Sequence, residues 1–187
     1  MNDIINALLL LASTREQQHI NLETLDMAQL VRNAQDRLSD FIHQHQAVLQ
    51  LPVSWPKVSG YPQWVEEVWV NYMSNAIKYG GRPPLLRLGA QADETGDVVF
   101  WLHDNGAALS AQQQTGLFNS FQRFSPKSAD GHGLGLSIVK RIIERLGGRV
   151  GYRIAADGGS VFWFSLPQAC DTAVPDTAVY DDSGKST

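Results

Sequence analysis

The spacing of apolar positions along the chain predicts three long helices. Apolar residues recur at helical spacing over residues 26–45, and Asp26 with a glutamine three residues later can cap the start of this helix. The same periodicity predicts a second helix from Pro62 to Tyr79 and a third over residues 134–146. A glycine pair follows each of these two segments, as is typical just past the end of a helix.

Shorter apolar stretches separated by turn residues predict the strands. Residues 85–91 and 98–103 flank a polar turn, and residues 149–154 and 160–166 flank another, so each pair is expected to form a hairpin. A proline-containing stretch within 47–55 suits a short edge strand. Because the strands are grouped, we expect an α+β fold, a two-layer sandwich with helices on one face of a mixed sheet.

Composition narrows the functional class. The chain has 187 residues, 43% of them hydrophobic, which is enough for one domain with a core. Its 15 basic and 19 acidic residues give a net charge of −4, so we expect no nucleic-acid partner held by a broad basic face. The single cysteine, Cys170, allows no internal disulfide and favours a reducing compartment, so we predict a cytoplasmic protein.

The two ends of the chain differ from its centre. Residues 4–12 form an apolar run on one helical stripe that is too short to cross a bilayer, so no membrane contact is expected from this fragment. The run fits equally a helix folded back on the core and a seam between two copies. Residues 24–168 contain the apolar pattern expected of a folded core, whereas the composition of residues 169–187 is typical of a disordered tail or linker.

A polar stripe interrupts the second predicted helix. Asn71, Asn75 and Lys78 lie at helical spacing, so their side chains are expected on one side of the helix. A solvated helix face explains such a stripe when it stands alone, but the surrounding positions are strongly apolar. Carboxamide oxygens and a lysine would suit a hydrated Mg²⁺ ion with phosphates.

One further motif directly follows a predicted strand, and another opens a predicted helix. The Asp-Asn-Gly sequence at 104–106 is either an ordinary turn or a base pocket whose carboxylate accepts a hydrogen bond from an exocyclic amine. Gly131, Gly133 and Gly135 open the third helix, where backbone N–H groups make an anion site. Their spacing fits neither common dinucleotide motif.

Together these segments resemble the catalytic ATP-binding domain of bacterial sensor histidine kinases, which shares a Bergerat-type fold with Hsp90, type II topoisomerase and MutL ATPases. The segments that carry the resemblance are the N box at 71–79, the G1 box at 104–106, the F box at 118–124, the G2 box at 131–136 and the closing strand at 159–167. One such match is common by chance, whereas five in the family's order are not.

The resemblance implies a site for ATP and Mg²⁺. Asn75 and Asn71 would bind Mg²⁺, Asp104 would bind the adenine amine, and residues 106–132 would form the ATP lid. For Arg123, a solvated surface cation is an equal alternative to a phosphate contact. The positions implied to contact the nucleotide or its metal ion are Asn71, Asn75, Lys78, Tyr79, Asp104, Gly106, Arg123, Gly131, Gly133, Leu134, Gly135 and Leu136.

Two departures from the family pattern bear on function. Ala108 stands where the G1 box usually has a second glycine, and we expect it to stiffen the lid hinge and to lower or alter nucleotide affinity. None of the five histidines is followed by the acidic and basic residues of a phosphoacceptor box. The acceptor histidine is therefore expected outside this chain, and residues 1–23 resemble the end of a dimerisation helix and its linker.

The favoured function is the ATP-binding catalytic domain of a two-component histidine kinase. Its partners would be ATP, the dimerisation and phosphoacceptor helices of the same kinase, a response regulator and, through the N-terminal run, a second copy. An ATPase of the same fold is disfavoured, because Asn71 stands where those relatives have a water-activating glutamate and Glu67 lies a turn away. A degenerate nucleotide-binding or dimerisation module without kinase activity is the alternative.

Overall fold

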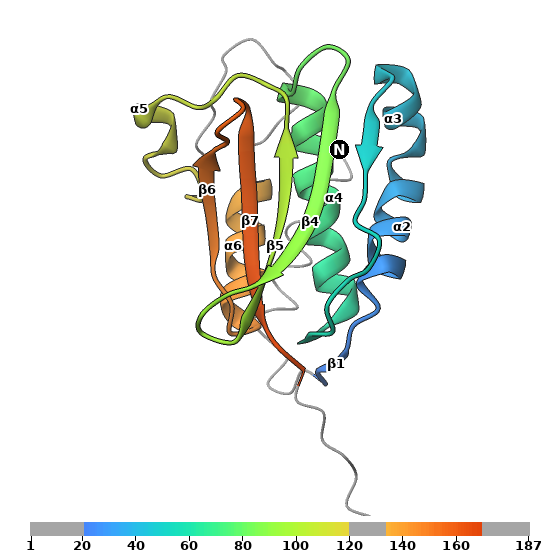
Figure 1. Cartoon of the computed structure of the whole chain (residues 1–187), viewed down its shortest axis with the longest axis vertical. Helices are drawn as coiled ribbons and strands as arrows, with labels where there is room; N and C mark the ends of the chain where they lie inside the picture. Colours follow the sequence, from blue (N-terminus) through green and yellow to red (C-terminus); the bar gives the residue numbers. More distant parts are fainter. Residues whose placement is uncertain (1–20, 120–133, 170–187) are drawn as a thin grey trace, which may run out of the picture.

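The computed structural model describes residues 21–119 and 134–169. Within these residues the chain forms two layers, a five-stranded sheet and helices packed on one of its faces (Figure 1). The elements in chain order are β1 (Glu23–Thr24), α2 (Met27–Arg37), α3 (Ser39–His45), β2 (Val48–Gln50), β3 (Ser59–Gly60), α4 (Pro62–Tyr79), β4 (Leu85–Ala92), β5 (Asp97–Asp104), α5 (Ala111–Gln114), α6 (Gly135–Arg145), β6 (Val150–Ile154) and β7 (Ser160–Pro167). This arrangement confirms the predicted α+β sandwich.

The sheet has the strand order β2-β4-β5-β7-β6. β2 runs parallel to β4, and the other neighbours are antiparallel, so the sheet is mixed. Both predicted hairpins form, and the predicted edge strand is β2. The central pairing of β5 with β7 joins the two hairpins and places Asp104 opposite Ser160.

Alternation along β5 separates the two faces of the sheet. Val98, Phe100, Leu102 and Asp104 are buried towards the helix layer, while the residues between them are partly exposed on the open face. This alternation explains how a carboxylate follows three apolar residues on the covered side. Asp104 consequently lies at the edge of the core, beside the end of α4.

Helix α4 is the centre of the helix layer, between α2 and α6 (Figure 1). Trp69 and Tyr72 on this helix are fully buried. The indole N–H of Trp69 donates to the sulfur of Met27 at 3.0 Å, and its ring meets Phe164 edge-on with centroids 5.3 Å apart. The hydroxyl of Tyr72 donates to the backbone oxygen of Trp163 at 3.1 Å, and burial raises the pKa of Tyr72. These contacts hold α4 to both α2 and the sheet.

The expectation of one continuous helix over 26–45 is wrong. Leu38 separates α2 from α3, because its backbone leaves the helical conformation with φ −104° and ψ 9°. Asp26 caps α2 as predicted, with its carboxylate accepting from the Gln29 N–H at 3.0 Å. The cap is one-sided, since the side chain of Gln29 bonds to other side chains along α2 instead.

The other elements follow the predictions more closely. Helix α4 has the predicted bounds, and α6 lies within the predicted 134–146. Strand β2 covers only part of 47–55, and it stops before Pro52, which has no N–H for a sheet hydrogen bond. The predicted N-terminal run 4–12 lies outside the described residues, and so does the predicted tail 169–187 except for its first residue. In the part of the chain that the structure describes, no helix is both long and apolar enough to span a membrane.

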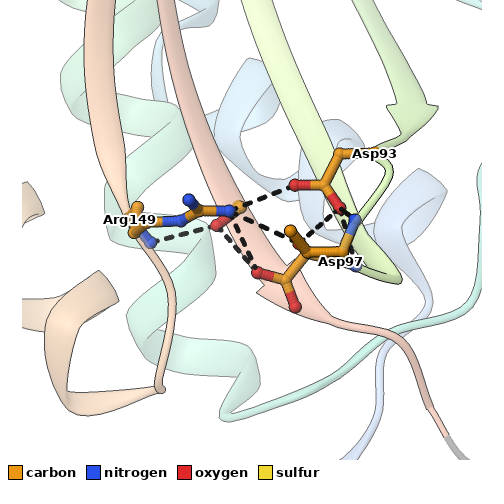
Figure 2. A network of polar contacts seen from close by, with 5 residues as sticks. Asp93, Asp97 and Arg149 are labelled. Carbon is orange, nitrogen blue, oxygen red and sulfur yellow. Dashed lines mark hydrogen bonds and ion pairs between the residues drawn. The ribbon is translucent and has the colours of Figure 1, made fainter.

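At the far end of the sheet, Arg149 joins the β4–β5 turn to the start of β6 (Figure 2). Its guanidinium lies 3.1 Å from a carboxylate oxygen of Asp93 and 3.7 Å from one of Asp97, and its backbone N–H donates to the Ser165 hydroxyl at 3.1 Å. Hydrogen bonds within the turn, first that from the Thr95 hydroxyl, lower the pKa of Asp93. Because Arg149 is largely exposed, these ion pairs contribute little beyond the turn's own hydrogen bonds.

The aromatic contact between sheet and α4 generates a stability prediction. Phe164 is fully buried and packs against Trp69 and, stacked at 5.2 Å, against Phe100. We expect Phe164→Ala to lower the free energy of unfolding by about 3–5 kcal/mol, because it removes burial and leaves a cavity. Urea unfolding measures this, with the fully exposed Val53→Ala as a control that should change by less than about 0.5 kcal/mol.

Candidate nucleotide-binding site

Asp104 provides a buried carboxylate at the end of β5. The residue is 5% exposed, and one carboxylate oxygen accepts from the Gly106 N–H at 2.8 Å. Burial raises the pKa of Asp104, and the hydrogen bonds from the backbone of Gly106 and Ser160, together with the nearby His103, offset only part of this effect. A buried carboxylate held by backbone N–H groups suits a neutral hydrogen-bond donor such as an amine on a base.

Gly106 lies where no side chain fits. A Cβ atom at this position would come within 2.7 Å of the Tyr79 carbonyl oxygen and 2.8 Å of both the Gly80 Cα and the Asp104 carboxylate. The backbone therefore passes directly against the end of α4 only because residue 106 is glycine. This contact brings the predicted N box and G1 box together.

Asn105 fastens the loop between α4 and β4 to the end of β5. Its side-chain oxygen accepts from the N–H groups of Gly81, at 3.1 Å, and Leu85, at 2.8 Å. Its side-chain nitrogen donates to the Pro83 carbonyl at 3.1 Å. The sequence analysis included Asn105 in the G1 box but predicted no contact for its side chain. Only the known tendency of asparagine at turns to bond to backbone groups could have indicated these hydrogen bonds.

Asn71 and Gly135 bring the N box against the start of α6. The Asn71 side-chain nitrogen donates to the Glu67 carbonyl at 2.9 Å. Its side-chain oxygen points at Gly135, where a Cβ atom would lie only 2.3 Å from that oxygen. The absence of a side chain at Gly135 thus allows α6 to begin beside the polar stripe of α4.

Asn75 lies one turn further along α4 and is partly buried. Its side chain makes no hydrogen bond to another described residue, and its role towards Mg²⁺ stays a prediction. Lys78, the third member of the stripe, has its ammonium 6.0 Å from the centre of the Phe41 ring on α3. Tyr79 is 53% exposed. The roles of Lys78 and Tyr79 towards phosphate and ribose stay predictions.

The start of α6 carries the described part of the G2 box. The helix begins at Gly135, and its N-cap residue Leu134 offers no side-chain acceptor to the first N–H groups. Leu134 and Leu136 are partly buried and pack against the core. The other predicted site residues, Arg123, Gly131 and Gly133, lie outside the described residues, as does most of the F box.

Ala108 fits its backbone without strain. Neither it nor Ala107 has a positive φ, so the observed loop does not need the second glycine of the G1 box. The methyl group of Ala108 is exposed. The expected effect on nucleotide affinity stays a prediction, but it has no basis in the conformation of this loop.

A pocket of about 300 Å³ lies on the open side of the same strand end. Arg87 and His103 line it, and both face away from the helices. Their polar groups are engaged: Arg87 lies 2.9 Å from Asp157, and the Nε2 of His103 lies 2.8 Å from the Gly158 carbonyl oxygen. Asp104, Asn105 and Gly106 also line this pocket, so it adjoins the predicted base site at the end of β5.

The sequence pattern of the family described as "Histidine kinase-, DNA gyrase B-, and HSP90-like ATPase" matches residues 60–169. The chain belongs to this family. The match begins just before α4 and ends after β7, so it contains every residue of the predicted site.

Similar proteins include sensor kinases. The methanogenesis regulatory histidine kinase FilI of Methanothrix harundinacea is 33% identical over 141 residues, which are 74% of this chain and 16% of FilI. Full-length ShkA in complex with AMPPNP matches with TM-score 0.73 and 25% identity, covering 89% of this chain and 35% of ShkA. The catalytic domain of histidine kinase ThkA shares the fold, with TM-score 0.66 and 21% identity over 80% of this chain and 97% of that domain.

Glu67 is engaged elsewhere in this histidine kinase-like ATPase domain. Its carboxylate lies 2.7 Å from the guanidinium of Arg37 on α2, and the same arginine lies 2.9 Å from Glu66. An ion-paired carboxylate directed at α2 is a poor general base for water beside Asn75. Glu67 is thus a charge that joins α4 to α2.

The contact between Asn71 and Gly135 predicts that Gly135→Ala changes the free energy of unfolding in opposite directions with and without the Asn71 side chain. Gly135→Ala should lower the free energy of unfolding by about 1 kcal/mol, because the new methyl group displaces the Asn71 carboxamide. In an Asn71→Ala background the same substitution should instead stabilise the chain, by up to about 1 kcal/mol, since alanine is the better helix former. Chemical denaturation of the four proteins checks this, and equal effects in both backgrounds would contradict it.

The raised pKa of Asp104 predicts a pH-dependent effect on stability. The folded chain binds this proton more tightly than the unfolded chain, whose ordinary value is 3.8, so the contribution of Asp104 to stability falls as pH rises above that value. We expect Asp104→Asn to be more stable than the parent at about pH 7 and to lose this advantage below about pH 4. Urea unfolding across this range tests it. The control is Asp97→Asn at the other end of β5, which should show no gain.

Proposed function

We propose that this chain is the ATP-binding catalytic domain of a two-component sensor histidine kinase. The observation that carries the proposal is a pair of close contacts made by α4: its end lies against Gly106, which bonds to Asp104, and Asn71 lies against Gly135 at the start of α6. Residues 24–168 form the catalytic domain, residues 1–23 the end of a dimerisation helix and linker, and residues 169–187 a tail or linker.

Adenine recognition rests on Asp104. Its carboxylate is only an acceptor, so it selects a base that presents an amine at this position. Gly106 lets the backbone lie close to the base plane, and the uncapped first turn of α6 offers N–H groups to phosphate oxygens. Lys78, Tyr79, Arg123, Gly131, Gly133, Leu134 and Leu136 complete the nucleotide contacts.

Asn75, with Asn71, is the protein side of the Mg²⁺ site. Among residues 21–119 and 134–169 there is no group of three or more histidine, cysteine, aspartate or glutamate side chains that could hold a metal ion. The two carboxamide oxygens suit an ion that also takes phosphate oxygens and keeps water, as Mg²⁺ does. When bound, Mg²⁺ would neutralise charge on the phosphates during transfer.

Transfer to a histidine outside this chain is favoured over hydrolysis. Asn71 cannot take a proton from water as a carboxylate can, and Glu67 is paired with Arg37. Positioning of the γ-phosphate then does most of the work of catalysis. The acceptor histidine is carried by the dimerisation and phosphoacceptor helices of the same kinase, dimerisation involves the N-terminal run, and a response regulator in the cytoplasm receives the phosphoryl group.

The similar proteins support this proposal at the level of the domain. FilI is a histidine kinase by name and ShkA is in complex with AMPPNP, and the chain spans 16% and 35% of their respective lengths. ThkA also matches in a complex with the response regulator protein TrrA, with TM-score 0.70 and 18% identity over 90% of this chain and 48% of that chain.

Calorimetric titration with ATP, with and without Mg²⁺, tests the site. We expect a dissociation constant on the order of 1 μM, near −8 kcal/mol, in the presence of Mg²⁺. Asp104→Asn should weaken binding by about 10-fold to 100-fold, because it removes a hydrogen bond to a charged acceptor. Asn75→Ala should abolish the tightening by Mg²⁺.

Matched controls separate site effects from general ones. Asp97→Asn makes the same change at the other end of β5, and Asn33→Ala removes an asparagine on α2 that bonds to Glu66. Both should bind as the parent does. A folded parent that binds without any effect of Mg²⁺, or not at all, would favour the alternative of a degenerate nucleotide-binding or dimerisation module without kinase activity.

A further inference from the structure

A chain of hydroxyl groups ties the segment that follows Asp104 to the β6–β7 hairpin. The Leu109 N–H donates to the Tyr152 hydroxyl at 2.8 Å. The Tyr152 hydroxyl lies 3.2 Å from the Ser160 hydroxyl, which in turn lies 3.5 Å from the Ala107 carbonyl oxygen. Two strands and the loop after β5 thus meet at one tyrosine.

The chemistry of the two ends sets the direction of this chain. An amide N–H can only donate and a carbonyl can only accept, so the Tyr152 hydroxyl accepts from Leu109 and donates to Ser160, and Ser160 donates to Ala107. Each hydroxyl then donates once and accepts once. Removing one of them leaves partly buried polar groups on both sides without their partner.

Ser160 connects this chain to the candidate base site. It is 3% exposed and pairs with Asp104 across β5 and β7, and its backbone N–H helps to lower the pKa of the Asp104 carboxyl. The Tyr152 hydroxyl therefore contacts the cross-strand partner of Asp104. The same hydroxyl also fixes residues 107–109 directly after Gly106.

The ring of Tyr152 is held by the core. It packs edge-on against Phe162 with centroids 5.3 Å apart, and Phe162 packs on Tyr72 of α4 at 5.7 Å. The position of the hydroxyl is therefore set by the rigid sheet and not by the loop that it holds. Phenylalanine would keep these ring contacts and remove only the hydroxyl.

We propose that Tyr152 is a positioning residue for adenine selectivity, which holds the loop after Asp104 and the Ser160 hydroxyl so that the Asp104 carboxylate stays in one place. The proposal rests on the proposed function. An acceptor at a fixed position rejects guanine, whose carbonyl cannot donate to it. A loosened loop lowers ATP affinity more than GTP affinity, because only the adenine contact depends on that fixed position.

The test is titration of ATP and GTP, each with Mg²⁺, into the full chain and into Tyr152→Phe. ATP binding should weaken about threefold to tenfold while GTP binding changes by less than about twofold, so the preference for ATP falls. Tyr61→Phe, at the other end of α4, makes the same chemical change and should match the parent. In the nucleotide-free chain, hydrogen exchange at the Leu109 amide should be at least about tenfold faster in Tyr152→Phe.

Each outcome has a defined meaning. A parent that binds no nucleotide overturns this proposal together with the proposed function. A parent that binds ATP, with an unchanged ATP-to-GTP preference in Tyr152→Phe, overturns this proposal alone, and so does a loss that is equal for both nucleotides.

A second variant covers the case in which Tyr152→Phe does not fold. Ser160→Ala removes the next hydroxyl of the chain and should lower the same preference. Where both variants fold, the combined substitution should weaken ATP binding by less than the product of the two single effects, because both break the same chain. Independent effects that multiply would overturn the proposal.

Discussion

The packing of α4 against the sheet is the constraint on which the site depends. Trp69 and Tyr72 fill the space between α2 and β7, and the Tyr72 hydroxyl bonds to the β7 backbone. Because α4 is held in this way, its end abuts Gly106 and Asn71 faces Gly135. The positions of the N, G1 and G2 boxes relative to one another are therefore set by apolar contacts within and just before the N box.

The site combines features that folding alone would not favour. Burial raises the pKa of the Asp104 carboxyl, and Gly106 and Gly135 stand where a Cβ atom would collide with the Tyr79 carbonyl oxygen or the Asn71 carboxamide oxygen. Such local conflict is typical of binding sites, where function needs a group that folding alone would not place there. The large aromatic core supported by α4 and β7 offsets this locally unfavourable environment.

The open face of the sheet is protected by aromatic side chains. Trp101 and Trp163 are cross-strand partners, and each ring covers a glycine on the next strand outward, Gly89 or Gly151. A Cβ atom on either glycine would lie 2.2 Å from the covering ring. Tryptophan rings over glycines thus cover the bare face that a two-layer sandwich leaves without helices.

The sequence alone determined the bounds of α4, both hairpins and the residue types of the site, because these depend on local periodicity, on turn residues and on motif spacing. It could not determine the break at Leu38 or the hydrogen bonds of Asn105, nor that Lys78 lies over Phe41 and Asn71 against Gly135. These features join segments far apart in the chain, and periodicity carries no information about which surfaces meet. Only the packing of α4, α6 and the sheet decided them, through the space available and the partners that buried polar groups require.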